Sequence, residues 1–69
     1  MINLTHLSGE SFVLNAEYIE TVEAKPDTVI TLFNGKKYLV KEPVEEVVRL
    51  VIEYKRKIGS ILVLPKEGE

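Results

Sequence analysis

One stretch of the sequence decides the fold, TVITLFNGKKYLV from Thr28 to Val40. Two runs rich in β-branched and aromatic residues, Thr28 to Phe33 and Lys36 to Lys41, flank Asn34-Gly35, the pair best suited to a two-residue type I′ turn. We therefore predict an antiparallel hairpin. Its two faces carry Val29, Thr31, Phe33, Tyr38 and Val40 on one side, and Ile30, Leu32 and Leu39 on the other. Because both faces are apolar, we expect each to be covered by another layer or by a second subunit.

Three further strands are predicted before this hairpin. We expect the first from Ile2 to Leu7, the second around Phe12 and Leu14, and the third from Tyr18 to Ala24. Glycine or asparagine marks the turns between them, at Ser8-Gly9-Glu10 and Asn15-Ala16-Glu17. Lys25-Pro26-Asp27 ends the third strand, because proline presets φ and the aspartate can bond its own downstream backbone. Ile19 and Val22 fall on opposite faces of that strand, which indicates a β-bulge.

A helix is predicted from Pro43 to Ile58. Pro43 fits the first helical position, and Glu45 and Glu46 sit near the positive end of the helix dipole. Lys55-Arg56-Lys57 in the predicted last turn and Gly59 just beyond it indicate where the helix stops. The apolar residues of this segment are Val44, Val47, Val48, Leu50, Val51, Ile52, Tyr54 and Ile58. They form an arc wider than one sheet face covers, so we predict a homo-oligomer.

Together these elements predict a single α+β domain over residues 1–59, a small antiparallel β-sheet or partly closed barrel of about five strands followed by one C-terminal helix. Residues 60–69 are predicted to be a C-terminal tail with an apolar segment at 61–64. The 69 residues include no cysteine, so neither a disulfide nor a thiolate zinc site reinforces the core, and we expect a reducing, cytoplasmic environment. The longest aliphatic run is Ile61 to Leu64, so we expect neither secretion nor membrane insertion.

The titratable residues suggest no catalytic or metal-binding constellation. His6 is the only histidine and Asp27 the only aspartate, and no spacing brings them to a serine nucleophile. Glu17, Glu20 and Glu23 are three residues apart, which on a strand alternates faces and pairs no carboxylates. We therefore predict no enzymatic activity, cofactor or metal. The net charge of −2 also argues against a nucleic-acid partner.

Two segments are the candidate partner-binding residues. The first is the turn Pro26, Asp27 and Thr28, which we expect to be exposed and which proline makes rigid, so that it presents a fixed contact at low entropic cost. The second is the apolar run Ile61, Leu62, Val63 and Leu64, because an exposed apolar run is typical of an added strand or a docking peptide. We expect a partner to contact both.

Motifs spread over residues 1 to 58 resemble one known family. They are Leu4-Thr5, Gly9, Phe12, Leu14-Asn15, Ile19-Glu20, Glu23, Pro26-Asp27-Thr28, Ile30-Thr31-Leu32, Asn34-Gly35, Lys37-Tyr38, Val40 and Glu42. The family that they resemble is the flagellar FlbD family. The resemblance implies a cytoplasmic protein of flagellated bacteria that raises motor power for swarming and acts at the flagellar motor or its stator units, with no enzymatic activity or cofactor. It implies nothing for the tail after Gly59.

A second resemblance belongs to another functional class. The opening Leu4 to Ser11 and the order of elements look somewhat like the carbon-storage regulator family, small dimeric RNA-binding proteins with intertwined strands. That family has an arginine after its Leu-Thr pair, where this chain has His6, and a second RNA-contacting arginine has no clear counterpart near Val40 to Pro43. RNA-binding regulation is therefore the alternative function, ranked second because phosphate neutralisation supplies much of such affinity.

Overall fold

The structure is a computed structural model that describes the backbone of residues 1–62 and the side chains of residues 1–58. Its elements are β1 (Ile2–Thr5), β2 (Ser11–Leu14), the 3₁₀ helix η1 (Ala16–Tyr18), β3 (Ile19–Ala24), β4 (Thr28–Leu32), β5 (Lys37–Val40) and α1 (Val44–Leu62). The predicted α+β fold of five antiparallel strands and one C-terminal helix is confirmed. The strands form a two-stranded sheet, β1-β2, and a three-stranded sheet, β3-β4-β5, which do not close into a barrel in the part of the chain described.

The β4–β5 hairpin is present, but its predicted register is wrong by one residue. The Leu32 N–H donates to the Lys36 carbonyl and the Gly35 N–H donates to the Leu32 carbonyl, so the loop holds three residues, Phe33 to Gly35. Gly35 has a φ of 91°, the left-handed conformation that a three-residue loop needs at its last position. The slip changes which side chains share a face, because strand side chains alternate.

In the observed register the hairpin has one buried face and one solvent-facing side, in place of two apolar faces. Thr28 pairs with Val40 and Ile30 with Tyr38, and the strand β4 alternates between buried and partly exposed residues along its length. The opposite face carries Thr31 and Lys37 beside Leu39, which is 43% exposed. The solvent-facing side of the hairpin is therefore less apolar than predicted, and it gives less reason to expect a second subunit there.

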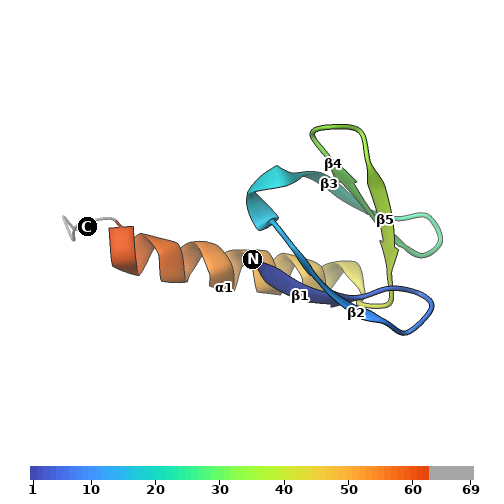
Figure 1. Ribbon diagram of the computed structural model, residues 1–69, viewed down its shortest axis with the longest axis horizontal. Coiled ribbons are helices and arrows are strands. Elements are labelled where there is room, and N and C mark those ends of the chain that lie inside the picture. The colour runs from blue at the N-terminus through green and yellow to red at the C-terminus, as the bar shows by residue number, and fades with distance from the viewer. Residues whose placement is uncertain (63–69) are drawn as a thin grey trace.

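The two sheets meet along a short seam between β1 and β5. His6 forms an isolated antiparallel bridge with Val40, and the Lys41 N–H donates to the Thr5 carbonyl at 2.9 Å. The β1–β2 loop is also a three-residue loop, with the same hydrogen bonds as the β4–β5 loop and with Gly9 at a φ of 104°. The seam lets the sheets face each other around one core (Figure 1).

The predicted β-bulge in β3 is confirmed, as a register shift between Ile19 and Thr21. It has a packing consequence, because Ile19 and Val22 both pack against the core although their spacing would separate them on a regular strand. Before it, the predicted turn at Asn15 is the start of η1, where the Asn15 side chain accepts a hydrogen bond from the Glu17 N–H at 3.0 Å. This cap fixes the direction in which the chain enters β3.

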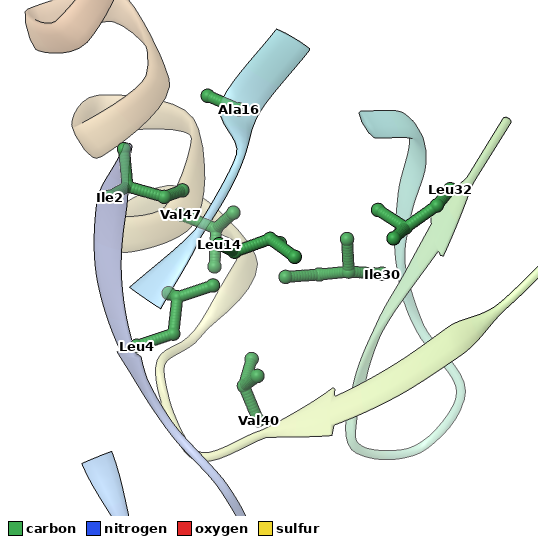
Figure 2. Close-up of a cluster of buried hydrophobic side chains, with 8 residues drawn as sticks. All are labelled: Ile2, Leu4, Leu14, Ala16, Ile30, Leu32, Val40 and Val47. Carbon is green, nitrogen blue, oxygen red and sulfur yellow. The ribbon is translucent and has the colours of Figure 1, made fainter. Parts of the chain in front are cut away.

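The core lies where the two sheets and the first half of α1 converge. Its buried residues are Ile2, Leu4, Leu14, Ala16, Ile30, Leu32, Val40 and Val47. Figure 2 shows the β1, β2 and α1 side chains meeting those of β4 and β5. Leu4, Ile30, Val40 and Val47 are at most 1% exposed, so β1, β4, β5 and α1 each contribute one fully buried side chain.

The helix continues past its predicted end. It begins at Val44, one residue after Pro43, and runs to Leu62, so Gly59 lies inside it and the basic run at Lys55 is not in its last turn. A glycine inside a helix costs only about 1 kcal/mol relative to alanine. In the sequence, Leu62 stands four positions after Ile58, so the helical period of apolar residues does not end at Gly59. No helix within the described residues is long and apolar enough to cross a membrane.

Only the first half of α1 is covered by the strands. Val47 is fully buried, and the second half projects beyond both sheets (Figure 1). Val48 and Ile52, on the edge of the apolar arc, are 43% and 52% exposed. The predicted excess of apolar surface on the helix is therefore real, and it lies on one side of α1.

Candidate protein-binding groove

An open groove of about 590 Å³ lies beside the start of α1. Three connections line it: the β1–β2 loop through Leu7, the β3–β4 turn through Pro26, Asp27 and Thr28, and the β5–α1 connection through Lys41, Pro43, Val44 and Glu45. Figure 1 shows the β1–β2 loop and the β3–β4 turn extending past the first turn of α1. The groove thus brings together the three turn residues predicted as a contact.

The β3–β4 turn places two of those residues at the surface and buries the third. Ala24 pairs with Thr28 across the turn, and the Lys25 N–H donates to the Asp27 carbonyl at 2.8 Å. Pro26 and Asp27 are exposed, as expected. Thr28 is only 6% exposed, which corrects its place on an exposed turn: as the first residue of β4, its side chain lies on the inward face with Ile30.

A hydrogen-bonded clasp fixes the opposite wall of the groove. The Glu42 carboxylate accepts the Thr5 N–H at 3.0 Å through Oε1 and the Thr5 hydroxyl at 2.8 Å through Oε2. Burial alone would raise the pKa of Glu42, but these two hydrogen bonds outweigh it and the pKa lies below its ordinary value of 4.5. The clasp ties β1 to the connection that carries Lys41 and Pro43, two residues that line the groove.

The chemistry of the groove suits a protein segment. Its lining is mixed, with apolar Leu7, Val40 and Val44 beside exposed, charged Asp27, Lys41 and Glu45. A hollow that combines apolar side chains with a few charges suits a side chain or a short peptide of a partner. Among the described residues, no three His, Asp or Glu side chains gather closely enough to hold a metal ion.

The described part of the other predicted contact, Ile61 and Leu62, is not at this groove. Ile61 and Leu62 belong to the last turn of α1, and Val63 and Leu64 lie outside the described residues. At 1.5 Å per helical residue, Ile61 is about 25 Å along the axis from Val44. The structure therefore does not bring the two predicted segments together within one copy of the chain.

Several residues of this region were missed from the sequence. Leu7, Lys41 and Glu45 follow or flank turns, which is the available signal, but nothing local shows that three separate turns converge. His6, for which the sequence suggests no catalytic partner, stacks on Phe12 with ring centroids 3.9 Å apart, and Tyr38 packs against both rings. These aromatic rings join the two sheets next to the seam and help to hold the groove walls.

Comparisons with known proteins connect this fold to one family. Residues 1–59, most of the 69-residue chain, match the family model FlbD, described as flagellar and swarming motility proteins. No curated protein and no solved structure gives a significant match. The matched region contains every strand, the whole groove and most of α1. The chain therefore belongs to the FlbD family of flagellar and swarming motility proteins.

Proposed function

We propose that this protein is a non-enzymatic flagellar accessory protein that supports swarming by binding a protein of the flagellar motor or stator, on the cytoplasmic side of the basal body. Membership of the FlbD family supports the flagellar role. The observation that carries the binding proposal is the groove, which the Pro26-Asp27 turn lines together with apolar Leu7 and Val44.

Apolar and charged residues of the groove contribute different interactions to binding. Leu7, 42% exposed, and Val44 offer apolar area that a partner side chain can cover. Asp27 and Lys41 supply charges of opposite sign on the rim, which select for a partner segment with complementary charges. Because Pro26 restricts its turn, little conformational entropy is lost when the partner docks.

Replacing Asp27 separates binding from folding. The Asp27 side chain makes no hydrogen bond within residues 1–58, so Asp27→Ala should change the free energy of unfolding by no more than about 0.5 kcal/mol. Swarming of a flagellated strain that lacks its own family member should be restored by the wild type and poorly by Asp27→Ala. Glu20→Ala is the matched control, since it removes an exposed carboxylate of β3 away from the groove.

Site-specific photocrosslinking identifies the partner directly. A photoreactive residue at position 7, in the groove, should link to a motor or stator protein in swarming cells. The same residue at position 13 should not, because Val13 is 60% exposed on β2 and does not line the groove. Equal crosslinking from both positions, or full swarming with both Asp27→Ala and Leu7→Ser, would show that the groove is not the binding surface.

A further inference from the structure

The groove does not end at the first turn of α1. Val44 and Glu45 line it, and Val48 and Ile52 follow at helical spacing on the same side of the helix. Both are large apolar residues, 43% and 52% exposed, and they lie on the side of α1 that the sheets leave uncovered. An apolar strip therefore runs from the groove along α1.

We propose that this strip binds a second copy of the chain. The two α1 helices then lie antiparallel, related by a two-fold axis that crosses them at the height of residue 50. This inference goes beyond the motor-binding proposal and does not depend on it. A two-fold pair is self-complementary, so every contact that the strip makes must occur twice. The spacing of the residues on the strip meets that condition.

The register follows from the midpoints of two residue pairs. In an antiparallel pair, residues lie at the same height when their numbers are symmetric about the axis. Val48 and Ile52 are symmetric about position 50, and so are Glu45 and Lys55. One register therefore places Val48 against Ile52 of the second copy and Glu45 beside Lys55 of the second copy. Two apolar contacts and two ion pairs form together.

The charges along α1 favour the antiparallel arrangement over the parallel one. Arg49 is engaged within its own helix, by Glu46 at 2.6 Å and by Glu53 at 3.5 Å. Glu45 forms no ion pair within residues 1–58, and Lys55 reaches Glu17 only at 3.9 Å through exposed atoms. Such an exposed pair contributes little and is easily exchanged. Parallel helices would instead set Glu45 against Glu45 and Lys55 against Lys55.

The same register places the helix end of one copy near the groove of the other. Residue 56 of the second copy lies level with Val44, and the end of its helix at Leu62 lies about 9 Å farther along the axis, beside the groove.

The mass in solution tests the pairing. Light scattering at micromolar concentration should give about twice the 7.8 kDa of one chain. Ile52→Glu should raise the dissociation constant of the dimer roughly tenfold or more, because it buries a charge between the two α1 helices. Val13→Glu is the matched control, with a similarly exposed apolar residue on β2, and should leave the mass unchanged. A monomeric mass for the wild type throughout that range would overturn the proposal.

Charge exchange and cysteine pairing test the register. Glu45→Lys and Lys55→Glu should each weaken the dimer several-fold, whereas the double variant should restore it, because the opposite charges meet again. The natural chain has no cysteine, so Glu45→Cys and Lys55→Cys can be mixed. The mixture should form a disulfide between the two variants. Neither variant should link to itself, because its own two cysteines lie about 15 Å apart along the axis. Self-linked products without mixed ones would refute the antiparallel register.

Discussion

Removing the Glu42 carboxylate should strongly destabilise the fold. Glu42→Ala deletes two hydrogen bonds from Thr5, at 3.0 Å and 2.8 Å, and leaves a partly buried backbone N–H without its acceptor. Hydrogen bonds to a charged group, together with the cost of the unpaired donor, amount to about 2–3 kcal/mol. A domain of this size is stable by roughly 3–10 kcal/mol, so the loss is a large fraction of the total. The melting temperature should fall by about 10–20 °C.

Urea unfolding of the wild type, Glu42→Ala and Glu42→Gln measures this loss, with Glu20→Ala as the control for removing an exposed carboxylate. Thr5→Val should cost about 1 kcal/mol, because it removes the hydroxyl and keeps the N–H. A double variant of Thr5 and Glu42 should be less destabilised than the two single losses added together, since both act on one contact. A change within about 0.5 kcal/mol for Glu42→Ala would refute the clasp.

The pH dependence of stability gives a second readout of the same contact. The pKa of Glu42 is lower in the folded protein than its ordinary value of 4.5, so its contribution is complete above that value. The contribution is lost as the pH falls through the lowered pKa of the folded state. The gap in unfolding free energy between the wild type and Glu42→Gln should therefore be widest near neutral pH and close in acid. A gap that stays constant would contradict the assignment.

Three further outcomes are expected. Gly35→Ala should lower the free energy of unfolding by about 1 kcal/mol or more in chemical denaturation, because the residue has a φ of 91°; a loss no larger than that of Lys36→Ala would contradict this. Labelled single-stranded RNA should bind weakly and without sequence preference at physiological salt, given the net charge of −2; sub-micromolar, sequence-dependent binding would favour an RNA-binding regulator. A chain that ends at Gly59 should keep its fold, measured by circular dichroism, but lose swarming; full motility would exclude a role for the tail.

The predictable part of the fold rests on local chemistry. Turn residues located all five strands, and the mismatch of Ile19 and Val22 revealed the bulge. The hairpin register was mispredicted because Asn34-Gly35 suits two loop types, and the choice between them depends on which face of β4 the core must bury. Only the packing of Ile30 against residues of other elements decides that choice.

The candidate site was harder to predict from the sequence than the fold, because it too depends on contacts between distant residues. The rigid turn at Pro26 was recognisable, because proline and aspartate act on their own neighbours. The clasp joins residues 37 positions apart, and no local pattern marks Thr5 as the partner of Glu42. The end of α1 was placed too early because a glycine is a stop signal only when the apolar period ends with it, and in the sequence Leu62 continues the period.

The seam between the sheets also sets the order of folding. Both hairpins close through three-residue loops, and such local pairings form within about 1–10 μs. The seam must instead close a loop of 37 residues between Thr5 and Glu42, whose entropic cost precedes any gain from the contact. We therefore expect the β1–β2 hairpin and the β3-β4-β5 sheet to form first and to dock last. Loss of the clasp should thus accelerate unfolding while leaving the refolding rate nearly unchanged, and the protein opens along the line where its two halves last met.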